Sequence, residues 1–107
     1  MSDTVTLTGE VWLWNSATSP GSWHFLTIDG AAGEAIAAHE AMRRLEFGHG
    51  RGFGSVKVRA QIGGSAWNTS VFPSSETGGY ILPLKAAIRK AEGIAKGSEA
   101  TVTLELL

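Results

Sequence analysis

Two groups of side chains in this sequence could recognise a ligand, and the first is basic. Arg51, Lys57 and Arg59 lie close together in the sequence, and Lys85 and Arg89 follow four residues apart. Residues with that spacing share one face of a helix. Converging lysine and arginine side chains can bind phosphate, a carboxylate or the backbone of a nucleic acid. Solvated surface charge is the commoner role of these residue types, so both interpretations stay open.

A glycine-rich segment surrounds the first of these cations. Residues 48–55 read GHGRGFGS, with four glycines around Arg51 and with Ser55 at the end. Backbone N–H groups of such a loop can hold an anion. Phosphate-binding loops, however, have a helix behind the glycines, whereas a strand-like sequence follows this one. We therefore expect a link from a helix to a strand, with glycines at positive φ.

The second group is aromatic. Four tryptophans occur in 107 residues, and Trp12 and Trp14 lie on the outward face of a predicted strand. Their rings would cover a helix or line a cleft, and Trp67, Phe72 and Tyr80 could extend the same aromatic wall. Aromatic residues more often fill the core of a small domain. A pocket with tryptophan walls and an arginine floor is nevertheless the first place to look for a ligand.

Catalysis and metal binding have weaker support. His24, His39 and His49 lack metal-ligand spacing, the sequence has no cysteine, and no His-Glu-x-x-His motif occurs. Ser70 has no histidine and acid that the sequence places beside it, and the Gly-x-Ser-x-Gly motif is absent. We predict no cofactor and no metal. A hydrolase or isomerase that uses Ser70 or His24 is kept as an alternative.

Composition and length indicate a single soluble domain, residues 1–107. A hydrophobic content of 43% with 18% charged residues is ordinary for a globular protein. The net charge of -1 provides no overall attraction to nucleic acid or anionic lipid. No basic leader and no apolar run of about 20 residues is present. We expect a cytoplasmic protein with no membrane association, either a monomer or a weak homodimer.

Hydrophobic periodicity predicts the elements that position these side chains. Alternating apolar residues predict six strands, at residues 4–14, 23–28, 55–62, 65–72, 79–82 and 100–107. Gly9 is a candidate bulge in the first strand, which should form a hairpin with the second. One helix is expected over residues 31–45 with Asp29 as its cap. A second should begin at Pro83 and end at Gly93.

The order of the predicted elements suggests a duplication. Residues 4–62 and 63–107 both run strand, strand, helix, strand, and Trp14-Asn15-Ser16 is similar to Trp67-Asn68-Thr69. Neither half could bury its apolar face alone. We therefore expect a mostly β fold with two helices: a pseudo-twofold double-split β-barrel, made of two strand-strand-helix-strand halves and capped by the helices. Chance similarity between two strand-rich segments is the alternative.

Several ordered blocks resemble the prokaryotic DUF1905 family. They are RGFGSV at 51–56, IGG at 62–64 followed by Trp67, TSVFP at 69–73, GGY at 78–80 and LPLKAAIRKA at 82–91. The resemblance runs from about Gly9 to the C-terminus. It implies a small double-split β-barrel capped by helices, and it carries no activity that can be transferred. The last third also resembles the swapped-hairpin half-barrels of AbrB and MazE, although the chain is more acidic than AbrB-like DNA binders.

The sequence thus predicts a non-enzymatic binding module for a small anionic or aromatic ligand or for a protein segment. An AbrB-like nucleic-acid-binding regulator and an unrecognised small enzyme are the alternatives. The candidate binding residues are Arg51, Ser55, Lys57, Trp67, Ser70, Tyr80, Lys85 and Arg89.

Overall fold

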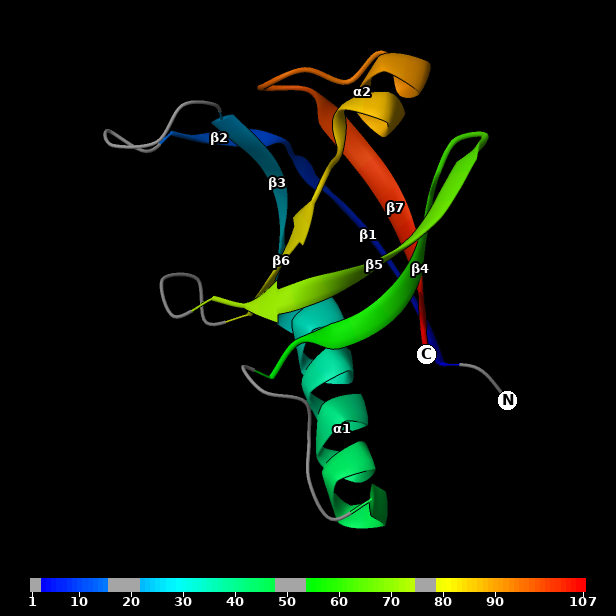
Figure 1. The fold of residues 1–107 in the computed structure, drawn as a ribbon. Coiled ribbons are helices and arrows are strands. Elements are labelled where there is room, and N and C mark those ends of the chain that lie inside the picture. Colours follow the sequence, from blue (N-terminus) through cyan, green and yellow to red (C-terminus); the bar gives the residue numbers. More distant parts are fainter. Residues whose placement is uncertain (1–2, 16–21, 48–53, 75–78) are drawn as a thin grey trace.

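The protein is mostly β structure with two helices. The computed structural model describes residues 3–15, 22–47, 54–74 and 79–107, and these contain seven strands and two helices (Figure 1). In chain order the elements are β1 (Asp3–Glu10), β2 (Trp12–Asn15), β3 (Ser22–Ile28), α1 (Gly30–Phe47), β4 (Val56–Ile62), β5 (Ser65–Pro73), β6 (Tyr80–Pro83), α2 (Ala86–Glu92) and β7 (Glu99–Leu106).

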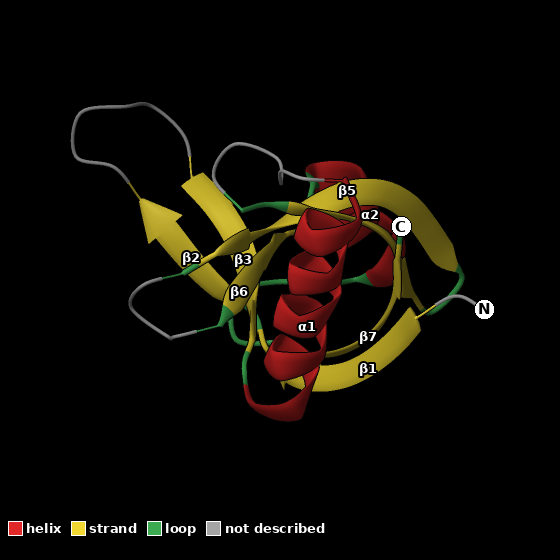
Figure 2. Ribbon diagram, turned by 90° about the horizontal axis from the view of Figure 1, so that it is seen from below, coloured by secondary structure: helices red, strands yellow, loops and turns green. Residues whose placement is uncertain are grey.

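The strands form one antiparallel sheet that curls into a half-barrel (Figure 2). Its order is β1-β7-β4-β5-β6-β3-β2, so the strands at its two ends are consecutive in the chain. Val11 joins them. The Val11 N–H donates to the Ser98 carbonyl, and the Gly97 N–H donates to the Val11 carbonyl, both at 2.8 Å. The chain therefore passes from one end of the sheet to the other within one residue.

The first predicted strand covers the right residues, but the structure divides it into two strands, β1 and β2. Residues 4–14 were expected to be one strand with a bulge at Gly9, whereas Gly9 pairs in register with Ala100 and the break falls at Val11. The bonds from Val11 to Gly97 and Ser98 cause the break. The predicted hairpin consequently forms between β2 and β3, while β1 pairs with β7.

The core fills the inside of the curled sheet. Every second side chain of β4 and of β7 is buried, as in a strand with one solvated face. Leu26, Leu82 and Leu104 are fully buried at the centre, and Ile36 of α1 and Ile88 of α2 join the same cluster. In Figure 1 the two helices lie at opposite ends of the curled sheet, α1 below it and α2 above it. They therefore cover the core where the sheet leaves it open.

The second helix begins later than predicted. Pro83 is the last residue of β6 rather than the first of a helix, and α2 starts after its N-cap Lys85. The ladder to β3 continues beyond Pro83, because the Leu84 N–H donates to the His24 carbonyl at 2.9 Å. Gly93 ends α2 in the left-handed conformation with φ of 64°, as predicted.

The tryptophans that suggested the duplication lie in different settings. Trp14 pairs with Trp23 of β3 and is 47% exposed, whereas Trp67 pairs with Ala60 of β4 and is buried. Their side chains therefore do not occupy matching positions in the sheet.

Candidate binding groove

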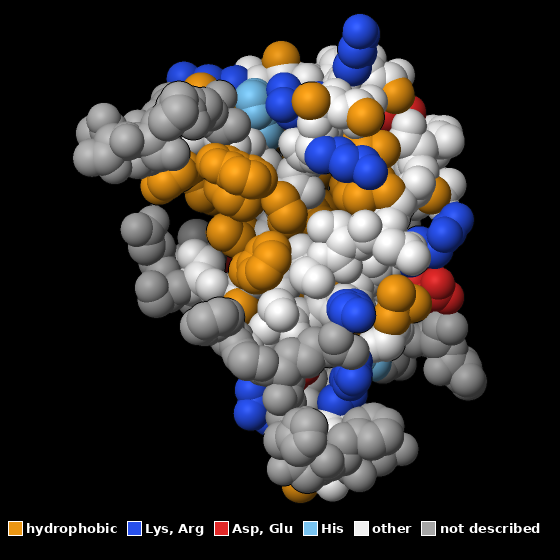
Figure 3. All heavy atoms as spheres, in the orientation of Figure 1, with side chains coloured by type: hydrophobic (Ala, Val, Ile, Leu, Met, Phe, Trp, Pro, Cys, Tyr) orange, Lys and Arg blue, Asp and Glu red, His pale blue; other side chains and the backbone are white. Residues whose placement is uncertain are grey.

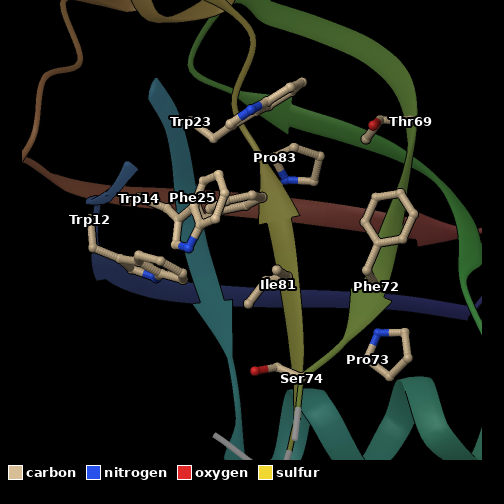
Figure 4. A pocket seen from close by; sticks show the side chains of 10 residues that line it. All are labelled: Trp12, Trp14, Trp23, Phe25, Thr69, Phe72, Pro73, Ser74, Ile81 and Pro83. Carbon is tan, nitrogen blue, oxygen red and sulfur yellow. The ribbon is translucent and has the colours of Figure 1, made fainter. Parts of the chain in front are cut away.

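An apolar groove of about 710 Å³ lies on the outer face of the sheet where β2, β3, β5 and β6 meet (Figure 3). Trp23 and Phe25 of β3 point into it because they alternate with the inward-facing residues of that strand, which include buried Leu26. We call it the aromatic groove. Its lining residues are Trp12, Trp14, Trp23, Phe25, Thr69, Phe72, Pro73, Ser74, Ile81 and Pro83 (Figure 4).

The hairpin of β2 and β3 builds one wall from cross-strand aromatic pairs. Trp12 lies opposite Phe25, with ring centroids 5.1 Å apart and planes tilted by 37°. The indole N–H of Trp12 donates to Thr27 Oγ1 at 2.8 Å, which fixes the orientation of that ring. Trp14 lies opposite Trp23, and these two rings are 47% and 58% exposed. The wall thus contains one ring held in place, Trp12, and two rings that expose apolar surface to solvent, Trp14 and Trp23.

The opposite wall comes from β5 and β6, which pair only briefly. Phe72 pairs with Ile81 and Pro73 with Tyr80, and no further pairs follow in the described ladder. Beyond Phe72 the two strands diverge, and Thr69 and Pro83 line the space that opens between them (Figure 4). Phe72 is 42% exposed and faces this space. The groove is therefore open along the line where β5 and β6 separate.

The lining determines which chemistry the groove can perform. None of the described lining residues is charged or titrates near neutral pH. Its polar groups are the hydroxyls of Thr69 and Ser74 and the indole N–H groups of Trp14 and Trp23, for which the described part of the chain provides no hydrogen-bond partner. Such a surface can bury apolar area and donate hydrogen bonds. The side chains described in this lining include none suited to proton transfer or to neutralising an anion.

Comparison with known families places the chain in one of them. The family described as a domain of unknown function, DUF1905, matches residues 8–104, from β1 into β7. The chain belongs to the DUF1905 family. The resemblance predicted from the ordered sequence blocks is thereby confirmed, and the match spans every residue that lines the aromatic groove. No curated protein matches the sequence.

The aromatic wall predicted for this DUF1905 domain divides between groove and core. Trp12, Trp14 and Phe72 line the groove, but Trp67 and Tyr80 are buried on the core side of the sheet. Trp23, Phe25, Ile81 and Pro83 were not among the candidates. Two of them could have been found. Alternation in residues 23–28 puts Trp23 and Phe25 on one face, and in the predicted hairpin that face lies beside Trp12 and Trp14.

The described basic candidates of the DUF1905 domain, Lys57, Lys85 and Arg89, do not line the groove. Arg51 lies outside the described residues. Lys57 is exposed on β4, and Lys85 precedes α2. Arg89 is turned back onto the chain, since its Nε donates to the Leu84 carbonyl at 3.1 Å. The Lys and Arg side chains visible in Figure 3 are spread over the surface rather than gathered at the apolar patch.

The two serine candidates also lie outside the lining. Ser55 precedes β4 and is partly buried. Ser70 pairs across the ladder with Lys57, so these two candidates are neighbours, and its chain neighbour Thr69 lines the aromatic groove. The structure therefore brings Ser70 next to the groove without turning its side chain into it.

Two charged residues of α1 lie near Tyr80 of β6. Glu40 is buried, and Arg44 Nε donates to Glu40 Oε1 at 3.1 Å, an i,i+4 pair that the sequence spacing could have indicated. Burial raises the pKa of Tyr80, the Glu40 carboxylate raises it further, and Arg44 partly offsets the effect. Tyr80 therefore stays protonated over the physiological range and is poorly suited to act as a base.

Metal and membrane sites find no support in the described residues. No group of three or more potential ligands comes together among them. None of their helices has the length and apolarity needed to cross a membrane.

His24 should make the stability of the domain depend on pH. Its Nδ1 atom is buried with no hydrogen-bond partner in the described part of the chain. Burial lowers the pKa of His24 below its ordinary value of 6.5, and nearby Arg89 lowers it further. Between the lowered pKa and 6.5 the unfolded state binds more protons, so stability is lost as the pH falls through that window.

Thermal unfolding followed by circular dichroism from pH 7.5 to 5.5 tests this expectation. The melting temperature should fall across the range, and the slope should flatten in His24→Gln, which cannot take up the proton. An equal slope in both proteins would mean that His24 is not responsible.

Proposed function

We propose that this DUF1905 domain is a binding module whose aromatic groove takes an uncharged apolar or aromatic ligand. The observation that carries the proposal is the exposure of Trp14, Trp23 and Phe72 around one uncharged groove. Exposed apolar residues are common singly, whereas a contiguous patch marks a binding surface. Covering it stabilises a complex by roughly 25 cal/mol for each Å² of apolar area removed from water.

The lining favours an uncharged ligand over the anionic one also predicted from the sequence. A phosphate or carboxylate needs cationic partners when it leaves water, and the described lining residues provide none. The lack of titratable lining side chains likewise favours binding over catalysis. Indole N–H groups on Trp14 and Trp23 are available to orient a ligand that carries a hydrogen-bond acceptor.

We further propose that the curled sheet is a double-split barrel of two equivalent halves. The strand partners support this topology: β3 pairs with β6 and β4 with β7, the strands at equivalent places in the two halves. Two other pairs of neighbouring strands also correspond between the halves. The pair β2–β3 corresponds to β5–β6, and the pair β1–β7 corresponds to β5–β4. The continuous β5 would then match β1 and β2 together. A crystal structure that superposes on itself after a half-turn would test the symmetry.

Intrinsic tryptophan fluorescence tests the binding proposal. Titration with neutral naphthalene or indole derivatives should change the emission saturably, and phosphate or benzoate should not. Trp23→Ala should weaken binding about tenfold, because it removes an exposed wall of the groove, and tenfold corresponds to about 1.4 kcal/mol.

A matched control is Met42→Ala, an exposed apolar residue on α1 outside the aromatic groove, which should leave the affinity unchanged. A response to phosphate that survives Trp23→Ala, or silence toward every neutral aromatic compound, would count against the groove.

A further inference from the structure

We infer that the ligand of the aromatic groove is an extended peptide segment that pairs with the edge of β5 at Ser70. The inference rests on the proposed function of the groove and names its partner. Two independent features carry it: a stretch of strand backbone left unpaired beside the groove, and the uncharged aromatic lining.

The direction of the Ser70 backbone follows from its neighbour on β4. In an antiparallel ladder the N–H and C=O of one residue point toward the same adjacent strand, and successive residues alternate. The Leu107 N–H donates to the Lys57 carbonyl at 3.0 Å, so the Lys57 backbone points toward the β7 side. Lys57 pairs with Ser70. The two residues therefore share no ladder bonds, and the Ser70 backbone points away from β4.

On that far side Ser70 meets no strand among the described residues. The β5–β6 ladder ends at the pair of Phe72 and Ile81. Continuing its register would bring Pro83 opposite Ser70, but proline has no N–H to donate and the strands have already separated. The Leu84 N–H is bonded to β3 instead. Among the described residues, the N–H and C=O of Ser70 therefore have no partner in the β5–β6 ladder.

The unpaired backbone lies at the groove. Thr69, next to Ser70 in the chain, and Pro83, across the gap, both line the aromatic groove. Figure 4 shows Thr69 and Pro83 facing each other across the diverging strands. An unpaired strand edge is a template for another strand, and peptide recognition by strand addition uses such edges. A peptide paired with Ser70 would lie along the aromatic lining.

The lining also defines the peptide. Side chains of an extended strand alternate between two faces, so every second residue would point toward Trp14, Trp23 and Phe72. Those residues should be apolar or aromatic, because an unpaired charge would lose its hydration in an uncharged groove. The expected partner is an uncharged segment with apolar residues at alternate positions.

Backbone pairing can be tested with the intact protein and three probes. The parent is a capped hexapeptide in which valine alternates with threonine. Two counterparts carry N-methyl groups on the odd or on the even amides, so that each loses the donors along one edge of the strand. The parent should change the tryptophan emission saturably. One methylated peptide should bind about tenfold more weakly, since it has lost bonds to β5, and the other should keep the affinity of the parent.

The protein side provides a matched pair of variants. Ser70→Pro removes the N–H that points away from β4 and should weaken binding of the parent peptide about tenfold, whereas Ser70→Ala keeps that N–H and should bind as the wild type. Hydrogen exchange of the Ser70 amide should slow when the parent peptide is bound. If Ser70→Pro does not fold, the methylated peptides and the amide exchange decide the question in the wild-type protein.

The outcomes separate this inference from the proposed function. Binding of naphthalene derivatives with no binding of the parent peptide would overturn peptide pairing and leave the groove intact. Equal affinity of all three peptides, with unchanged hydrogen exchange of the Ser70 amide, would also overturn peptide pairing and leave the groove intact. Failure of both naphthalene derivatives and peptides to bind would overturn the groove as well.

Discussion

Gly79→Ala should lower the free energy of unfolding by about 3 kcal/mol, because a side chain at this position has no room. A Cβ on Gly79 would overlap the Ile28 carbonyl oxygen and approach Asp29 Cα to 3.2 Å. These are backbone atoms at the place where β3 and β6 meet, and Ile28 there pairs with Tyr80. Neither strand can retreat without breaking this ladder.

Urea unfolding followed by circular dichroism measures the effect. Gly64→Ala is the matched control, because a Cβ there meets no atom within 4 Å and the backbone is not in the left-handed region. Gly64→Ala should stay within about 0.5 kcal/mol of the wild type. Equal midpoints for the two variants would show that the strands accommodate a methyl group at Gly79.

Leu26→Ala should cost about 3 kcal/mol for a different reason, the cavity that it leaves. Leu26 is 0% exposed on β3, pairs with Leu82 of β6 and packs closely against Gly9 of β1. Three strands therefore lose contacts with one truncated side chain. Because Phe25 and Thr27 flank Leu26 and face the other side of the sheet, the groove should loosen with the core.

The same urea titration checks Leu26→Ala against Leu45→Ala. Leu45 lies on α1 and is 81% exposed, so its truncation should change stability by no more than about 0.5 kcal/mol. A similar loss in both variants would mean that burial at Leu26 does not control stability.

The two strands in the middle of the chain were predicted well because each has a buried face. Residues 65–72 and 55–62 were expected as strands, and the structure has Ser65–Pro73 and Val56–Ile62. A shift by one residue would move the apolar set of such a strand to the wrong face, so the pattern specifies the register. Prediction of the mostly β class with two helices followed from these alternations.

The errors arose where contacts distant in sequence decide the structure. Nothing in the alternation of residues 4–14 indicates a break at Val11, which depends on bonds to Gly97 and Ser98. Pro83 suits the first turn of a helix and the end of a strand equally well, and the bond from Leu84 to His24 selects the strand. Local sequence carries no information about either bond.

The site was predicted in part for the same reason. Alternation showed that Trp12 and Trp14 face outward. Whether Trp67 and Tyr80 lie on the same side of the sheet as these two depends on the strand order, which local sequence does not provide. Trp67 faces the core because it lies on the same face of β5 as buried Val71 and pairs with buried Ala60 of β4. The basic candidates were grouped by spacing in the sequence, and of those that the structure describes, Lys57, Lys85 and Arg89 do not line the groove.

The contrast between Trp67 and Trp23 has a practical consequence. One indole is sealed inside the protein and the other stands in water, at 7% and 58% exposure. A collisional quencher such as iodide would dim the outer fluorophore and spare the inner one, since dissolved ions do not penetrate a packed interior. The same emission spectrum can therefore report unfolding and groove occupancy as separate signals, with no dye attached.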